Sequence, residues 1–312
     1  MEPESPSIIR KPVLAGEGCP NIAPVNPSET STPTTQIEVR IDRDTRLPGR
    51  AWCAERPRAL IAVVHGLGEH SGRYAALAGA LVQRRFTVVA FDLPGHGEAS
   101  GVRGDAPSWA MVRDQCIPPM FSVTRGMPGQ PPDLPVVLLG HSLGGVLALD
   151  YALAHPRTLL GLVLSAPAVK STPPPGWKVA LARVAGAVAP RIGFSNGIDA
   201  RAISRDPEVL ALRGADPLVH GKITPQFYFG FEEARARVMA EARRLQVPTL
   251  ILQGAADRVA SPQGALELNG HAPHGMVRLL TYRDGYHEIF NDLDRDQAIS
   301  DLTGWLDAVL VV

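Results

Sequence analysis

The segment from residue 136 to residue 156 places a single serine where a buried strand meets a helix. Four apolar residues, VVLL at 136–139, predict the strand, and apolar residues at helical spacing follow up to His155-Pro156. Between them stands GHSLG, residues 140–144, which fits the pattern G-x-S-x-G. In a nucleophile elbow the serine lies on a strained turn that exposes its hydroxyl, and glycines two positions before and after it avoid collisions. Ser142 is therefore predicted to be a nucleophile, and a glycine-rich turn without chemistry is the alternative.

A nucleophilic serine needs a base, and the base needs an orienting acid. In the fold that carries this elbow they follow in the order Ser, Asp or Glu, His, each in a loop after a strand. Asp257 follows the apolar run 249–252, and His287 follows the run 276–280. The sequence therefore predicts a catalytic triad of Ser142, Asp257 and His287.

Other interpretations of these residues remain open. A turn aspartate and a solvated or capping histidine are the alternatives for Asp257 and His287. Asp284 lies three residues before His287 on the same predicted loop, where a local turn suits it better. His271 and His274 precede the last strand, so they lie at its wrong end.

Two backbone N–H groups are expected to bind the oxyanion of the reaction. One belongs to Leu143, the residue after the nucleophile, and the other to the loop that follows an earlier strand. That loop reads HGLG at residues 65–68, and Leu67 is the expected donor. We expect His65 to order this loop through hydrogen bonds rather than to transfer protons.

The elements that must position these residues alternate along most of the chain. Strands are predicted near residues 37–41, 60–64, 87–91, 135–139, 160–164, 249–252 and 276–280, with helical patterns between most of them. This alternation predicts a mainly parallel sheet with helices on both faces. It lapses from residue 168 to residue 246, a stretch too long for a crossover loop, where we expect a helical insertion without strands.

One predicted helix of the insertion carries an apolar stripe. Trp177, Leu181, Val184 and Val188 share a narrow helical face. We expect this face to pack against the body of the protein. The alternative is that it dips into a membrane surface to collect lipid, although few basic residues accompany it.

Composition narrows the partners and the compartment. Lys and Arg number 31, as do Asp and Glu, and aromatic residues make up 5%, which argues against a nucleic-acid partner. Three cysteines, Cys19, Cys53 and Cys116, form neither a metal motif nor a disulfide framework. No apolar run has the length of a membrane span or a signal peptide, so we expect a cytoplasmic protein, with peripheral membrane contact left open. Residues 1–35 are expected to be a disordered leader.

The motifs around these residues resemble those of a known family. The segment HGLGEHSGRY at 65–74 resembles the signature of monoacylglycerol lipases, in the α/β-hydrolase superfamily and the group with serine aminopeptidases and lysophospholipase-like enzymes. The resemblance covers about residues 36–311. Further matching segments are DLPGHGEAS (92–100), LGHSLGG (139–145), LSAP (164–167), ISRDPE (203–208), DPLV (216–219), LQGAADR (252–258) and GYHE (285–288).

The resemblance implies an α/β-hydrolase fold with a mostly parallel eight-stranded sheet and a helical cap after the sixth strand. The core then comprises residues 36–167 and 247–312, and the cap residues 168–246. The resemblance also carries the triad and the two oxyanion donors onto the residues named above, and it needs no metal or organic cofactor. Glu69 and Arg73 match positions near the glycerol-binding end of the family's pocket, and a loop-stabilising ion pair is their alternative role.

Two of the chain's departures from the family pattern concern the site and a helix of the core. Some members carry a second histidine three residues after the catalytic one, where this chain has Phe290. Pro118-Pro119 falls where the family has a continuous helix, and the proline pair is expected to break that helix.

The sequence thus predicts a serine hydrolase that cleaves a monoacylglycerol to fatty acid and glycerol through an acyl-enzyme on Ser142. A lysophospholipase, a thioesterase, a general carboxylesterase or a peptidase acting on N-termini would use the same triad and stays open. A binding module without catalysis is a remote alternative, because such folds usually lose a triad residue and here all three are present.

Overall fold

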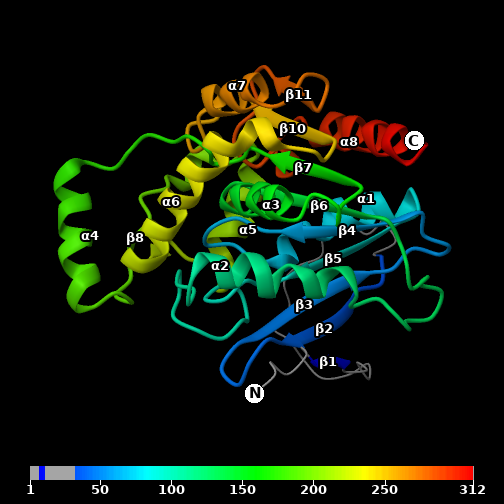
Figure 1. Ribbon diagram of the computed structural model, residues 1–312, viewed down its shortest axis with the longest axis horizontal. Helices are drawn as coiled ribbons and strands as arrows, with labels where there is room; N and C mark the ends of the chain where they lie inside the picture. The colour runs from blue at the N-terminus through cyan, green and yellow to red at the C-terminus, as the bar shows by residue number, and fades with distance from the viewer. Residues whose placement is uncertain (1–6, 11–31, 312) are drawn as a thin grey trace.

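A twisted central sheet organises the chain (Figure 1). The computed structural model describes residues 7–10 and 32–311. Within these residues the sheet has nine strands in the order β1-β2-β3-β5-β4-β6-β7-β10-β11. The strands are β1 (Ser7–Arg10), β2 (Thr35–Arg40), β3 (Arg46–Trp52), β4 (Ala59–Val64), β5 (Phe86–Phe91), β6 (Val136–His141), β7 (Gly161–Ser165), β10 (Thr249–Gly254) and β11 (Val277–Tyr282).

The sheet is mostly parallel, as the sequence predicted. The six strands β5, β4, β6, β7, β10 and β11 run parallel to one another. β1, β2 and β3 form an antiparallel edge, and β3 pairs antiparallel with β5. Eight strands match the expected sheet, and β1 is a ninth. β1 lies within residues 1–35, which were expected to be a disordered leader, so that expectation does not hold for residues 7–10. A strand of four residues is too short to show a periodic pattern in the sequence. Residues 1–6 and 11–31, including Cys19, lie outside the described residues.

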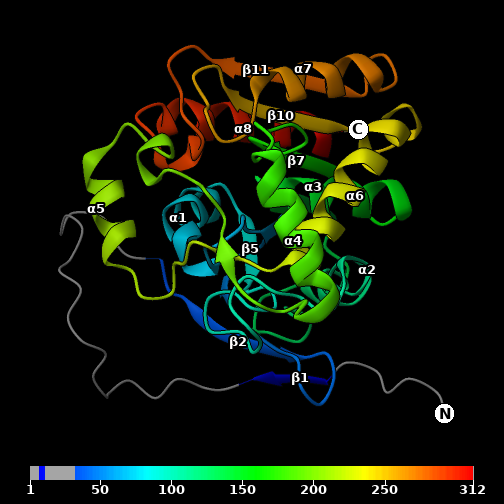
Figure 2. The same ribbon diagram turned by 90° about the vertical axis from the view of Figure 1, so that its left-hand side faces the viewer.

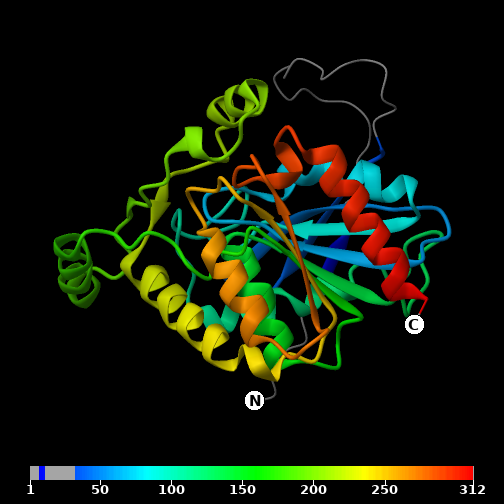
Figure 3. The same ribbon diagram turned by 90° about the horizontal axis from the view of Figure 1, so that it is seen from above.

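Helices cover both faces of the sheet, with a separate apolar core on each (Figure 3). On one face lie α1 (Ala75–Gln83) and α8 (Arg295–Leu310). On the other lie α3 (Leu143–Ala154), α6 (Pro225–Glu241) and α7 (Pro262–His271). The sequence of strand β4, ALIAVV, fits this arrangement. Its alternate residues enter opposite cores, and all six are buried. Continuous apolar runs are typical of such doubly covered strands.

The predicted helix break at the proline pair is present. A short α-helical turn, α2 (Trp109–Met111), leads into a π-helical turn, η2 (Val112–Cys116), and a 3-10 turn, η3 (Pro118–Phe121), begins at the first of the two prolines. Further 3-10 turns are η1 (Ser71–Tyr74), η4 (Ala200–Ala202), η5 (Ala242–Arg244) and η6 (Ile289–Asn291).

Residues 168–246 connect β7 to β10 and are mostly helical, with α4 (Gly176–Val188) and α5 (Pro207–Ala215) ahead of α6. The expectation of an insertion without strands is wrong, because β8 (Phe194–Ser195) and β9 (Lys222–Ile223) pair antiparallel within it. Two residues per strand are too few to produce a pattern in the sequence. We refer to residues 168–246 as the cap.

The apolar stripe of α4 faces outward. The exposed fractions of Trp177, Leu181, Val184 and Val188 are 65%, 51%, 66% and 81%, and no residue of the helix is buried. Figure 1 shows α4 standing away from the body of the molecule, and in Figure 2, which is viewed from that side, α4 lies toward the reader. The expectation that this face packs against the body is therefore wrong. None of the helices in the described part of the chain has the length and apolar character needed to span a bilayer.

Candidate active site

Ser142 occupies the tight turn between β6 and α3. Its backbone has φ 54° and ψ −117°, a conformation that costs energy for any residue with a side chain. A Cβ on Gly140 would collide with the carbonyl oxygen of Gly144, and a Cβ on Gly144 would collide with the carbonyl oxygens of Val64 and His65. The turn therefore packs against both its own helix and the end of β4. This backbone is that of a nucleophile elbow.

The His287 side chain is held by Asp257. Its Nδ1 lies 2.8 Å from Asp257 Oδ2, and the two side chains are 5% and 0% exposed. The N–H groups of Val259 and Ala260 donate to Asp257 Oδ1, at 2.7 and 2.9 Å, and Gln253 donates to Oδ2 at 3.1 Å. These donors fix the carboxylate toward the imidazole, whereas the rival Asp284 is exposed.

This pairing sets the protonation of the imidazole. Because Nδ1 donates to the carboxylate, Nε2 carries no proton in the neutral ring and is the basic atom. Burial acts to lower the pKa of His287, but the Asp257 carboxylate, with a contribution from Glu288, holds it above the ordinary value. Ser142 and His287 line the same small pocket. The described residues include no direct hydrogen bond between them, as is common before substrate binds.

Leu67 and Leu143 present backbone donors beside the nucleophile. Both line a cleft of ≈ 830 Å³ together with Ser142. Leu143 is the first residue of α3, so its N–H has no acceptor within the helix. Among the described residues, the Leu67 N–H donates no backbone hydrogen bond. The two groups predicted to bind the oxyanion are thus available.

The loop that carries Leu67 is ordered by its neighbours. The Leu93 N–H donates to His65 Nε2 at 2.9 Å, so His65 Nδ1 carries the proton and donates to the Gly66 carbonyl at 2.8 Å. Burial lowers the pKa of His65, which favours this neutral form. At Gly68, where φ is 77°, the carbonyl accepts from the His220 N–H of the cap at 2.9 Å. These contacts support the structural role expected for His65.

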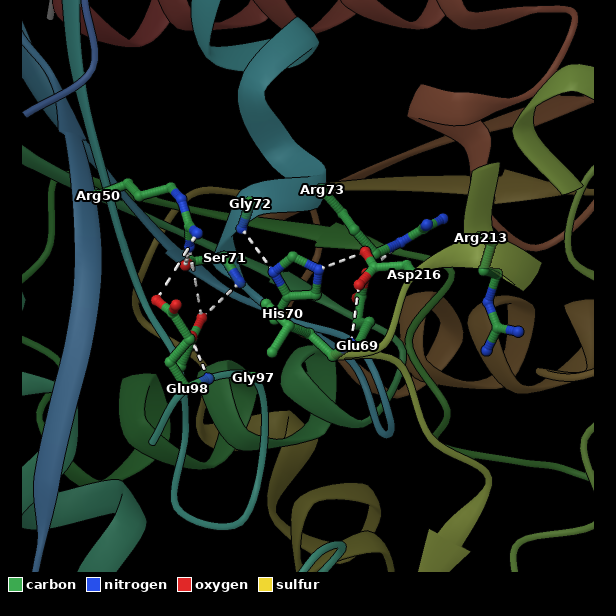
Figure 4. A network of polar contacts seen from close by, with 12 residues as sticks. Arg50, Glu69, His70, Ser71, Gly72, Arg73, Gly97, Glu98, Arg213 and Asp216 are labelled. Atoms are coloured by element: carbon green, nitrogen blue, oxygen red, sulfur yellow. Dashed lines mark hydrogen bonds and ion pairs between the residues drawn. The ribbon is translucent and has the colours of Figure 1, made fainter. Parts of the chain in front are cut away.

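Glu69 and Arg73 are paired with each other (Figure 4). Arg73 Nε lies 3.3 Å from Glu69 Oε2, and Arg73 Nη2 donates to Glu288 Oε2 at 2.5 Å. Glu69 Oε1 accepts from the Gly66 N–H and the Tyr74 hydroxyl, at 2.6 and 2.8 Å. Burial opposes ionisation of Glu69, yet His141 and Arg73 lower its pKa to about 2. This geometry supports the ion-pair alternative, although Glu69 also lines the pocket that Ser142 and His287 share.

Two charged residues near the nucleophile have no role that the sequence predicts. Glu288 and Arg213 line the pocket of Ser142 and His287, the first from the loop after β11 and the second from α5 of the cap. The signal for Glu288 was its place next to the predicted base. Arg213 lies in no motif, and only the packing of α5 on the core brings it near.

The cap is joined to the core close to this site. The Gly72 N–H donates to His70 Nδ1 at 3.1 Å, so His70 Nε2 donates to Asp216 Oδ2 at 2.7 Å, at the end of α5 (Figure 4). The Glu288 N–H donates to the Ile203 carbonyl at 2.8 Å.

A second pocket extends the cleft away from Ser142. It has a volume of ≈ 280 Å³ and lies beneath α4. It shares part of its lining with the cleft, namely Pro174, Lys178, Asn196, Ile223 and Tyr228.

Residues 7–10 and 32–311 contain no group of three or more His, Cys, Asp or Glu side chains arranged to hold a metal ion.

Known proteins are similar to this chain over most of its length. The family model described as serine aminopeptidase, S33, matches residues 55–294. The monoacylglycerol lipase of Mycolicibacterium smegmatis is 33% identical over 80% of this chain and 88% of its own length, and the human monoglyceride lipase is 35% identical over 76% and 78%. The crystal structure of the Paleococcus ferrophilus monoacylglycerol lipase, 33% identical, has a TM-score of 0.75 and matches 84% of this chain and 99% of that one. Fold, motifs and these similarities together show that the chain belongs to the serine aminopeptidase S33 family of α/β hydrolases.

Proposed function

We propose that this chain is a serine hydrolase that cleaves the ester bond of monoacylglycerols, releasing a fatty acid and glycerol. The observation that carries the proposal is the position of Ser142 on an elbow that opens into a large cleft with apolar cap residues along it. A single acyl chain needs such a cleft, and the small polar pocket that Ser142 and His287 also line has room for one hydroxyl-sized group of the alcohol. The monoacylglycerol and monoglyceride lipases among the relatives support this substrate.

The reaction follows from the geometry of the site. His287 Nε2 takes the proton of the Ser142 hydroxyl as the oxygen attacks the ester carbonyl, and Asp257 orients and stabilises the charged imidazole. The N–H groups of Leu67 and Leu143 bind the oxyanion, and one such donor is worth about 3–4 kcal/mol. His287 then protonates the departing alcohol oxygen. Water, activated by the same Nε2, hydrolyses the acyl-enzyme and frees Ser142.

The cap supplies the acyl site and the contact with lipid in this proposal. Residues 168–246 act as a cap over a core of residues 36–167 and 247–312. The exposed stripe of α4 rests on a membrane surface, with Trp177 and Val188 in the interface, and the acyl chain passes beneath α4 toward Ser142. The protein is then peripheral at membranes, and no cofactor takes part.

Fatty-acid release from matched mono-, di- and triacylglycerols and a lysophospholipid tests the substrate. We expect the monoacylglycerol to react fastest, and Ser142→Ala to fold normally while losing roughly 10⁴-fold or more of the turnover. Faster release from the lysophospholipid would instead assign a lysophospholipase, and wild-type rates in Ser142→Ala would remove this residue from the mechanism. A fluorophosphonate should label the wild type and not the variant, whereas no labelling of the folded wild type would indicate a binding module.

A further inference from the structure

Arg213 is a cation whose donors are poorly used. Its side chain is 15% exposed, and its Nε is shielded from solvent without a hydrogen-bond partner. The nearest carboxylate oxygen, Glu288 Oε1, lies 4.0 Å away. Burial lowers the pKa of Arg213 in spite of that carboxylate. Buried donors almost always have a partner, because leaving one unsatisfied costs about 1–3 kcal/mol.

The acceptor opposite Arg213 is also unused. Glu288 Oε2 accepts from Arg73 and Asn291, whereas Oε1 accepts no hydrogen bond from the described residues. In Figure 4 the Arg213 side chain extends from α5 beside the Glu69–Arg73 pair, without a hydrogen bond or ion pair to the other residues drawn. An unused donor and an unused acceptor therefore face each other.

The space next to these two atoms has the size of one small polar group. The pocket that they line with Ser142, His287 and Glu69 has a volume of ≈ 20 Å³, enough for about one water-sized group. One oxygen at about 2.8 Å from each atom bridges a donor and an acceptor 4.0 Å apart. That oxygen must accept from Arg213 and donate to Glu288, which a hydroxyl does. A neutral group also suits the charges there, because the carboxylates of Glu69 and Glu288 are already balanced by the guanidinium groups of Arg73 and Arg213.

We propose that Arg213, together with Glu288, binds a free hydroxyl of the substrate's leaving alcohol and so makes the enzyme select esters of a small neutral polyol over esters of simple alcohols. The inference rests on the proposed function and deepens it. The pocket adjoins both Ser142 and His287, so its occupant belongs to the alcohol that His287 protonates. The acyl chain extends along the larger cleft, which Arg213 and Glu288 do not line. The His70–Asp216 bond holds the end of α5, and thereby Arg213, against the core.

The test compares two esters of one fatty acid, the 1-monoacylglycerol and the methyl ester, whose leaving alcohol has no second hydroxyl. The measured quantity is the ratio of kcat/KM for the two, which does not depend on how much of a variant is folded. Arg213→Met should lower this ratio about 10-fold or more, since a hydrogen bond from a charged donor is lost. Arg213→Lys, which keeps a cationic donor, should recover part of it. Arg244→Met, on an exposed arginine paired with Glu241, is the matched control and should leave the ratio unchanged.

The reverse half-reaction gives a second measurement. With the methyl ester as acyl donor and glycerol added, the acyl-enzyme either reacts with water to give fatty acid or passes its acyl group to a glycerol hydroxyl to give monoacylglycerol. Arg213→Met should lower the proportion of monoacylglycerol formed, also by about 10-fold, because the same hydroxyl contact is missing.

The outcomes separate this inference from the proposed function. If Arg213→Met lowers kcat/KM equally for both esters, the role of Arg213 is refuted while the lipase activity stands. The same holds if it changes neither the ratio of kcat/KM nor the proportion of monoacylglycerol formed. A wild type that hydrolyses 1-acylglycerol 3-phosphate, whose leaving alcohol is anionic, with a higher kcat/KM than the monoacylglycerol would refute the choice of a neutral polyol. A wild type that hydrolyses the methyl ester and not the monoacylglycerol would refute the proposed function, and this inference with it.

Discussion

Replacing Leu181 and Val188 of α4 by serine tests the proposed contact of the exposed stripe with a membrane. Full burial of a leucine or valine side chain is worth about 1.5–3 kcal/mol. The two side chains are 51% and 81% exposed, so the area that they can bury in lipid together slightly exceeds that of one fully exposed side chain. The double substitution should therefore weaken membrane binding by roughly 2–4 kcal/mol, which is roughly 30- to 700-fold in the partition coefficient.

Co-sedimentation with phosphatidylcholine vesicles measures the partition coefficient directly. Neutral lipid suits the test because the stripe carries few basic residues, which leaves apolar burial as the main contribution. Leu266→Ser/Leu293→Ser is the matched control, since these side chains are 50% and 59% exposed but lie outside α4. We expect the control protein to bind vesicles as the wild type does, and hydrolysis of vesicle-borne substrate to fall with the α4 variant's binding.

Two results would refute this reasoning. If the wild type does not sediment with vesicles, the stripe has another occupant. If the control variant loses as much binding as the α4 variant, the contact is not confined to α4, and loss of apolar surface in general accounts for the effect.

Two further perturbations examine the base and the elbow. Because Asp257 holds the pKa of His287 above its ordinary value, and the neutral imidazole is the base, kcat/KM should rise with pH through an inflection above about 6.5. Asp257→Asn should shift that inflection to lower pH and reduce the plateau by roughly 10⁴-fold, and an unshifted inflection would mean that another group titrates. Gly144→Ala places a Cβ against two backbone carbonyl oxygens that cannot rotate away, so urea titration should show a loss of about 1–3 kcal/mol in the free energy of unfolding. Gly304→Ala in α8, where a Cβ meets nothing within 4 Å, should instead gain about 0.5–1 kcal/mol, and equal effects would contradict the steric argument.

The sequence predicted the parts of the fold that have strong local signals. Strands such as β4 and β6, buried on both faces, appear as unbroken apolar runs, and the elbow needs glycine at fixed offsets from Ser142. Asp257 followed because it comes shortly after β10, another fully buried strand. His287 followed from the short apolar run of the edge strand β11 and from the order Ser, Asp, His, because β11 itself is only partly buried. The five-residue motif around Ser142 is weak alone. It became a specific prediction because a strand pattern precedes it and a helix pattern follows it, and all three agree.

Other features left no local signal. Strands β8 and β9 are shorter than one period of alternation, and the sequence could not show them. The stripe of α4 identified an apolar face but not what the face contacts, since a core and a membrane select the same side chains. Arg213 is one charged residue on an exposed helix, and its place beside Glu288 depends on contacts 75 positions apart along the chain.

One part of the cap is hydrogen-bonded to the loops of the site, whereas α4 makes few contacts with the core. This difference bears on where substrate enters. The loop of Leu67 is bonded to the cap through Gly68 and His220, and the loop of His287 through Glu288 and Ile203. Moving that part of the cap outward would displace both the oxyanion donor and the base. α4, in contrast, has no buried residue, and an apolar pocket lies beneath it. We therefore propose that substrate enters at the α4 end, where its apolar chain can pass into the pocket without disturbing the two loops that hold the proposed oxyanion donor and base.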